Sequence, residues 1–282
     1  LLKTKYIMKR IKNVVTISLF ISALFMGLSM PANAQCEVRN TAIKAGETIN
    51  YDLYFNWKFV WVKCGTAYMK TTATTWQSKP AFRTYLITKG SKKADMFFRM
   101  RDTLVSVVST NLCPHYYYKG SFEGKRLYKD EAYYTYHNGE VYVRLRKQRK
   151  GVFTSAQKKS PNCVYDMLSI LAQARSYDPR NYKIGQRINF DMVGGTDIDH
   201  EILIYRGKKN IKAENDTVYR CLVFSYVEHK NGKDKEIVTF YVTDDENHLP
   251  IRLDMFLNFG SAKAFLSSVS GNRHPFTSIV AK

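Results

Sequence analysis

Residues 128–145 read YKDEAYYTYHNGEVYVRL and decide the fold class. The pair Asn138-Gly139 separates two runs rich in aromatic and β-branched residues, at positions 128–136 and 141–145. A type I′ hairpin turn needs a positive φ at both central residues, which Asn and Gly tolerate best. The stretch therefore predicts an antiparallel hairpin, and the rest of the chain is read outward from it.

The same β pattern recurs along the chain. Positions 49–57 alternate apolar and polar residues, and with residues 64–69 they predict a hairpin over 47–71. Further predicted strands are residues 82–88, 103–109, 116–122, 187–192, 201–205, 218–228, 236–242, 251–256 and 262–269. Asn231-Gly232 gives a second hairpin signal between two of them. No alternation of strands with helices appears, so the sheet should be antiparallel, and so many strands must curl or close.

One segment breaks the β pattern and predicts a helix over residues 161–177. Its apolar residues follow helical spacing, at Val164, Met167, Leu168, Leu171 and Ala172. Ser160-Pro161 is a suitable start and Asp178-Pro179 a suitable end. The expected fold is mainly β: a large curved antiparallel sheet forming an open or closed barrel, with this one principal helix packed against it or plugging it.

Composition excludes several classes of protein. Of 282 residues, 45% are hydrophobic, 24% charged and 14% aromatic, which is ordinary for a globular domain. A disordered tail, a collagen-like repeat and a multi-span membrane protein do not have this balance.

The first 34 residues predict a signal peptide that is removed. Lys9, Arg10 and Lys12 precede an apolar run from Val14 to Met30, and Ala32-Asn33-Ala34 fits a cleavage site. Met8 is the natural start, and the expected mature chain is a single domain over 35–282, exported to the periplasm or cell envelope. Asn33 and Gln35 do not fit a lipid-attachment motif before Cys36, so we expect no lipoprotein; a retained anchor helix is the alternative.

The charge balance points to polyanionic surroundings. Lys and Arg number 44 and Asp and Glu 24, a formal charge of +20. Cleavage would remove five basic residues and leave +15. Such a charge attracts lipid headgroups, lipopolysaccharide phosphates or acidic glycans. Export argues against nucleic acid as the partner, and a generally basic proteome is the alternative explanation.

The sharpest basic cluster follows the Asn-Gly turn. Strand alternation places Tyr142, Arg144, Arg146 and Gln148 on a solvated face, with the basic tip continuing through Arg149 and Lys150 into the next turn. Lys147 belongs to the same run but to the other face. Basic residues close to tyrosines suit phosphate and sugar recognition. The binding residues predicted from sequence are Arg144, Arg146, Lys147, Arg149 and Lys150; the alternative is a merely solvated hairpin.

The cysteines and histidines show no catalytic or metal-binding pattern. The disulfide candidates are Cys36, Cys64, Cys113, Cys163 and Cys221, with one or two bridges or none, and an odd count leaves at least one thiol free. The six histidines are scattered, without metal-ligand spacing or a nucleophile elbow. The acidic run 243–248 lacks a calcium-loop spacing and suggests a turn instead. We expect no metal and no cofactor.

Several blocks of the chain resemble the domain-of-unknown-function 3108 family. They are residues 46–51 with Trp57 and 65–67, then 100–103, 165–169 with Arg175, and 243–250. Members are exported proteins of Gram-negative bacteria, common in Bacteroidota. The resemblance spans nearly all of residues 40–270 and implies an exported, mainly β domain with no assigned activity and no catalytic residues. Cys64 stands where the family has Ala, so a bridge from Cys64 would be peculiar to this chain.

Three functional hypotheses follow. The first is a non-enzymatic module that binds or carries lipid or glycolipid in an apolar cavity of the barrel. Trp57, Trp61 and Trp76 are candidates to line a cavity, although Trp57 fits the buried face of its strand and is better read as a core residue. The second is an envelope scaffold that docks on anionic membrane or glycan through the basic hairpin. The third is a hydrolase assembled only by folding. The ligand, the disulfide pairing and the oligomeric state are not readable from the sequence.

Overall fold

The computed structural model describes residues 36–57, 60–92, 100–123, 126–230, 232–257 and 260–281. All of them belong to one compact unit of the chain. The predicted signal peptide, and Asn231 of the second hairpin turn, lie outside the described residues. No helix among those described is long and apolar enough to span a membrane.

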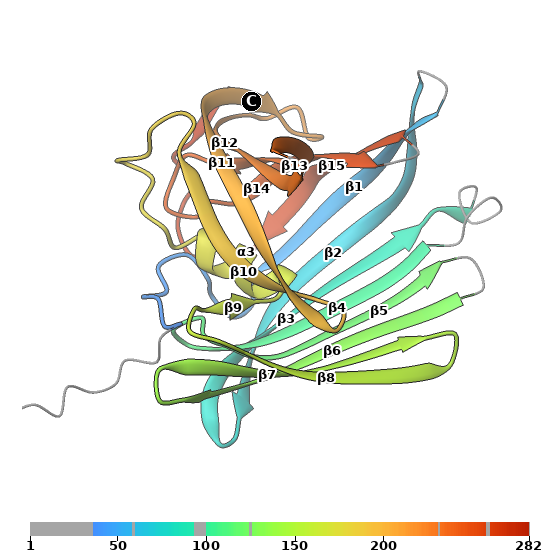
Figure 1. Cartoon of the computed structure of the whole chain (residues 1–282). Coiled ribbons are helices and arrows are strands. Elements are labelled where there is room, and N and C mark those ends of the chain that lie inside the picture. Colours follow the sequence, from blue (N-terminus) through green and yellow to red (C-terminus); the bar gives the residue numbers. More distant parts are fainter. Residues whose placement is uncertain are drawn as a thin grey trace, which may run out of the picture. The chain divides into compact units, whose positions relative to one another are not determined.

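The unit is mainly β with one helix in the described residues (Figure 1). The first half contains β1 (Thr48–Trp57), β2 (Val60–Trp76), β3 (Lys79–Gly90), β4 (Met100–Ser109), β5 (Pro114–Glu123), β6 (Arg126–His137), β7 (Glu140–Arg149) and β8 (Val152–Ser160). The second half contains β9 (Val164–Tyr165), α3 (Met167–Ala174), β10 (Arg187–Gly194), β11 (Asp197–Lys212), β12 (Val218–Lys230), β13 (Lys233–Thr243), β14 (Pro250–Leu257), β15 (Gly260–Ser270) and β16 (Ile279–Ala281).

The strands form one sheet that nearly closes into a barrel, as expected. Its order runs from β8 back to β1, then from β15 back to β9, while β16 pairs with β12. Neighbours are antiparallel except β9 and β10, which are parallel. The β1–β15 ladder joins the two halves, so the unsealed seam lies between β8 and the β9–β10 edge.

The inner faces of the strands fill the interior. Ile49, Leu53, Val141, Val143 and Leu145 alternate along their strands as the sequence predicts, and all are buried in one hydrophobic cluster. The Asn138-Gly139 turn has φ values of 52° and 77°, the positive pair that a type I′ turn requires. The predicted hairpin is therefore confirmed.

The predicted helix is confirmed, but its bounds are wrong. It spans Met167–Ala174 rather than 161–177, because Ser160 ends β8 and Val164 is buried in β9. The helix cap is Asp166, whose Oδ1 accepts the N–H groups of Leu168 and Ser169 at 2.9 Å each. The Ser169 hydroxyl accepts the Asp166 N–H in return, which completes a capping box.

Three strands have no counterpart among the predicted ones: β8, β9 and β16. Residues 154–159 of β8 read TSAQKK, without apolar alternation, because β8 is an edge strand that packs little on the core. The turn after β7 is Lys150-Gly151, both with positive φ. Arg149 thus ends a strand, and the prediction that it belongs to the tip is wrong.

Candidate functional site

The structure divides the predicted basic cluster between two faces of the sheet. Arg144 and Arg146 are exposed on the outer face of β7, as predicted. Arg149 points to the inner face of the sheet, as Val141 and Val143 do. Its guanidinium carbon lies 5.1 Å from the centroid of the Tyr128 ring. Lys147 has the same parity and reaches the β10–β11 turn at Gly195, while Lys150 is exposed in the β7–β8 turn. The five residues therefore do not form one binding surface.

Acids on β6 neutralise two of these arginines. Arg149 pairs with Asp130 at 2.8 Å, and Arg146 lies 3.8 Å from Glu131 and 4.3 Å over the Phe153 ring. In sequence no acid interrupts the cluster, but cross-strand pairing brings Glu131 opposite Arg146. Of the outer arginines of β7, Arg144 alone has no acidic partner among the described residues. Its guanidinium lies 4.6 Å from the centroid of the Tyr133 ring.

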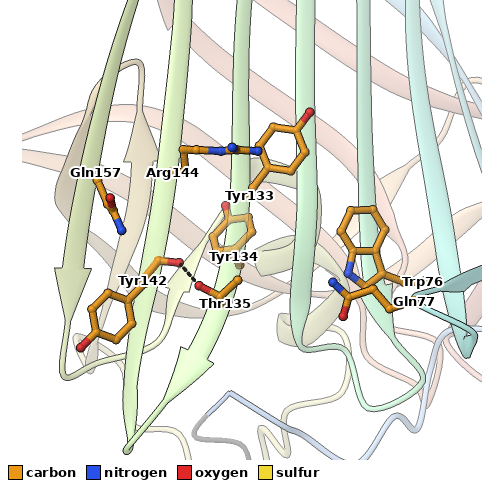
Figure 2. A pocket seen from close by; sticks show the side chains of 8 residues that line it. All are labelled: Trp76, Gln77, Tyr133, Tyr134, Thr135, Tyr142, Arg144 and Gln157. Atoms are coloured by element: carbon orange, nitrogen blue, oxygen red, sulfur yellow. Dashed lines mark hydrogen bonds between the residues drawn. The ribbon is translucent and has the colours of Figure 1, made fainter.

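An open groove of about 380 Å³ lies beside Arg144 on the outer face (Figure 2). The β2–β3 turn forms one wall and β6, β7 and β8 form the floor and the other wall. It is lined by Trp76, Gln77, Tyr133, Tyr134, Thr135, Tyr142, Arg144 and Gln157. Figure 2 shows Arg144 extended across β6 toward Tyr133, with Gln157 on the far side of Arg144 and Trp76 with Gln77 across the groove. The Thr135 hydroxyl donates to the Tyr142 carbonyl at 3.4 Å, which spans β6 and β7 at the groove floor.

A row of aromatic rings crosses this face. The Trp76 ring stacks on Tyr116 at 6.1 Å and on His115 at 6.0 Å between centroids. Tyr116 contacts Tyr133 at 4.9 Å, and Tyr133 carries the Arg144 guanidinium. Burial lowers the pKa of His115, so the ring beside Trp76 is held neutral. This row of flat rings offers a surface on which a ligand ring can stack. The guanidinium at its end adds one positive charge that no acid pairs with among the described residues.

A second, smaller hollow of about 220 Å³ lies on the opposite face of the same strands. It is polar and is lined by Lys119, Ser121, Tyr128, Asp130 and Arg149. Two of its lining side chains are already engaged, because Arg149 bonds Asp130 and the Ser121 hydroxyl donates to Asp102. The outer groove is therefore the stronger candidate site.

Burial works against nucleophilic chemistry by the thiols. Cys36 and Cys163 form a disulfide, and Cys64, Cys113 and Cys221 are free. Burial raises the pKa of Cys113 to about 11 and that of Cys221 to about 12, and it also raises the pKa of Cys64. A thiolate is the reactive form, so these groups are chemically quiet at neutral pH.

The histidines bond to carboxylates and backbone carbonyls, or lie against aromatic rings. His200 lies 2.5 Å from Asp191, and His229 lies 2.6 Å from Asp234. His248 and His274 each bond a carbonyl oxygen at 2.7 Å. His115 stacks on Trp76, and the His137 ring lies 6.0 Å from that of Tyr142. In the part of the chain that the structure describes, no group of three potential metal ligands is close enough to hold an ion.

Three of the sequence blocks that suggested a family meet in a buried structural network. Arg175, which follows α3, donates from Nη1 and Nη2 to Glu47 at 2.6 and 2.8 Å. Its Nε donates to the Asn247 carbonyl at 2.9 Å. The side chains of Glu47 and Arg175 are only 1% and 3% exposed, so substrate does not reach them. These blocks hold β1, α3 and the β13–β14 turn together.

The acidic run 243–248 is a turn. Asp245 Oδ1 accepts from the Thr243 hydroxyl and from the Asn247 N–H, and its Oδ2 accepts from Ser278. These bonds use the carboxylate oxygens that a cation would need. The interpretation of this run as an Asx-type turn agrees with the geometry.

Sequence reasoning missed the role of Trp76 and Gln157 in the groove. Trp76 lies far from Arg144 in the sequence, and only the curl of the sheet places the β2–β3 turn beside β6, whereas Gln157 lies opposite Arg144 on β8, a strand that the sequence did not predict. The available signal was the nearby density of tyrosines, which indicated stacking but not its partner. Trp61 lies at the tip of β2 instead, and the side chain of Trp57 is outside the described set.

Comparison with known proteins places the chain in a family without an assigned activity. No curated protein matches it. A solved structure from Brucella abortus, described as a beta-barrel-like protein of domain of unknown function DUF1849, is similar with a TM-score of 0.55 at 10% identity. That likeness covers 83% of this chain and 98% of the other, and it shows the fold. The model of the family described as protein of unknown function (DUF3108) matches residues 50–267, so the chain belongs to that family.

Proposed function

We propose that the protein is an exported, non-enzymatic binding module of the cell envelope whose outer groove binds an acidic glycan. The main support is a row of side chains, Trp76, Tyr116, Tyr133 and Arg144. Its aromatic rings end at a guanidinium that no described acid neutralises. A sugar ring packs on an aromatic face, and a carboxylate or phosphate on that ring would meet Arg144. Gln77 and Gln157 flank the groove with amide donors and acceptors for hydroxyl groups.

Lipid carriage inside the barrel has less support. The inner faces of β1, β7 and β15 meet in a packed hydrophobic cluster that includes Leu168 of α3. A carried lipid would have to displace these side chains. The hollows described above lie against polar and aromatic residues, and the larger one is on the outside.

The described thiols and histidines give the hydrolase hypothesis little support. The free thiols have raised pKa values, and His200, the most exposed paired histidine, bonds Asp191 rather than a hydroxyl. Neither the matched family nor the similar structure carries an enzymatic description.

Calorimetric titration with a polyuronate tetrasaccharide tests the proposal, with the neutral tetrasaccharide of the same linkage as a reference ligand. Arg144→Gln should weaken polyuronate binding by roughly 10- to 100-fold, since hydrogen bonds to charged groups contribute about 1.5–3 kcal/mol. Trp76→Ala should weaken binding of both sugars, because it removes the stacking surface.

Arg146→Gln is the matched control. Arg146 is exposed on the same strand face but is paired with Glu131, so its replacement should change affinity less than about fivefold, because exposed charge contacts contribute only about 0–1 kcal/mol. Equal loss from Arg144→Gln and Arg146→Gln would mean diffuse charge attraction rather than a groove. No binding of polyuronate by the parent protein would refute the proposal.

A further inference from the structure

Exposed large apolar residues gather at the ends of two neighbouring hairpins, far from the groove. The set comprises Val60, Trp61 and Val62 of β2 with Phe256 and Leu257 of β14, and is called the apolar tip below. Their exposed fractions are 62%, 38%, 49%, 42% and 40%. Single exposed apolar residues are ordinary on protein surfaces, but a contiguous group marks an interaction site.

Strand pairing makes the tip contiguous. β1 pairs with β2 up to Trp57–Val60, β14 with β15 up to Leu257–Gly260, and β1 with β15 at Phe55–Ala262. The two hairpins therefore form one four-stranded ribbon, β2–β1–β15–β14. Figure 1 shows β1 and β2 running out to a narrow end beside the ends of β14 and β15.

The β1–β2 hairpin continues past the strand beside it. The β2–β3 ladder ends at Gly65–Gly90, and β2 extends from Gly65 out to Val60. At about 3.3 Å per residue, Val60 lies roughly 16 Å beyond the end of that ladder at Gly65. The apolar residues are thus at a projecting end and not on the barrel wall.

Exposed apolar residues lie on both faces at the end of this ribbon. Successive residues of a strand point to opposite faces, so Val60 and Val62 occupy one face and Trp61 the other, and Phe256 and Leu257 are divided in the same way. A flat partner would cover one face and leave the other in water. An occupant that surrounds the ribbon satisfies both faces, and a fluid lipid interface does so.

Charge near the tip fits an anionic bilayer. Lys263 Nζ lies 4.0 Å from the centroid of the Trp61 ring, whereas the half-exposed Lys63 of β2 is already paired with Asp52 at 2.5 Å. Trp and Lys together are typical of the headgroup region of a bilayer. There the indole ring is half buried and the ammonium group remains hydrated. The expected mature chain still has 15 more basic than acidic residues, so approach to an anionic surface is favoured.

We infer that the apolar tip inserts into the interface of an anionic lipid bilayer and holds the barrel at the membrane surface. This inference is independent of glycan binding, because the tip and the groove share no residue. In this proposal, apolar insertion and electrostatic attraction to anionic lipid act together, as they do for interfacial segments in general.

Cosedimentation of the purified protein with vesicles tests it, using equal parts phosphatidylcholine and phosphatidylglycerol and, in parallel, phosphatidylcholine alone. The parent protein should bind the anionic vesicles more tightly. Trp61→Ser with Leu257→Ser should weaken binding by about 100-fold, because each apolar anchor contributes roughly tenfold. Trp61→Phe should retain binding, and unchanged melting temperatures will show that the variants are folded.

Ile184→Ser is the matched control, since Ile184 is 78% exposed but precedes β10, outside the ribbon. It should bind like the parent, as should Arg144→Gln. In a variant with Trp57→Phe and Trp76→Phe, brominated lipid should quench the fluorescence of Trp61. The inference is overturned if the parent fails to bind, if the serine variant binds equally, if Trp61 is not quenched, or if the serine substitutions instead dissociate a lipid-free dimer.

Discussion

Asp166 shows how one residue organises the helix from a buried position. It is fully buried, it caps α3, and it accepts the Ser106 hydroxyl at 2.9 Å. Burial raises its pKa from 3.8 to about 6, against the hydrogen bonds that lower it. The sequence suggested Ser160 as the cap because Pro161 follows it. Ser160 is instead drawn into β8 by backbone pairing with Val141, a long-range contact that local spacing does not contain.

The raised pKa of Asp166 predicts a pH dependence of stability. The folded state holds the proton more tightly than the unfolded chain, so this contribution is complete below about pH 4 and is lost as pH rises through about 6. Asp166→Asn keeps a capping side chain without ionising. The variant should therefore gain roughly 2–3 kcal/mol over the parent between acidic and neutral pH.

Urea unfolding across this pH range measures the difference between Asp166→Asn and the parent. Asp178→Asn serves as a control, because Asp178 is exposed and Arg180 lowers its pKa to about 2, the opposite direction. A constant difference between parent and Asp166→Asn at all pH values would show that Asp166 does not titrate in this window.

At the scale of elements, α3 is fixed by a charge pair that sequence reasoning did not find. Glu47 precedes β1 and Arg175 follows the helix, 128 positions later. The resemblance to a family marked both residues but assigned them no contact. The strands that alternate are predictable because each strand carries its own pattern. The ion pair and the groove are not, because each needs residues from distant elements, and the start of the helix is not, because it depends on where the β7–β8 pairing ends.

Breaking the Glu47–Arg175 pair should destabilise the protein strongly. Arg175→Met leaves a buried carboxylate without its partner and should cost about 3–5 kcal/mol of unfolding free energy. The double variant Glu47→Gln with Arg175→Met should lose less than the single one, since no buried charge remains. Chemical denaturation of the parent and these variants gives the coupling free energy between Glu47 and Arg175. Arg180→Met, at an exposed pair with Asp178, should barely change the midpoint, and a similar loss there would contradict the role given to burial.

At the scale of the whole molecule, the seam is the feature that sequence could not place. A curled sheet was predictable from the number of strands, but which edges stay unpaired depends on the final closure. Side chains bridge the seam where backbone does not: Lys158 pairs with Asp197 at 3.0 Å, and the Ser160 hydroxyl donates to Asp191 at 3.4 Å. The chain crosses from β8 to β9 at the same end, through Cys163.

The Cys36–Cys163 disulfide should stabilise this end of the barrel. It ties the segment before β1 to the crossing, and Gln173 of α3 donates to the Cys36 carbonyl at 2.8 Å. Its two cysteines are 127 positions apart, so the cross-link restricts the unfolded chain considerably. Removing it with Cys36→Ala and Cys163→Ala should cost about 2–5 kcal/mol.

Thermal unfolding with and without dithiothreitol separates this effect from a packing defect. Reductant should lower the melting temperature of the parent to near that of the double alanine variant and should leave the variant unchanged. The far-ultraviolet circular dichroism should stay that of a β protein, because neither Cys36 nor Cys163 belongs to a strand. A parent protein whose melting temperature does not respond to full reduction would contradict a stabilising disulfide. A clear response would instead tie full stability to an oxidising compartment, the environment expected of an exported chain.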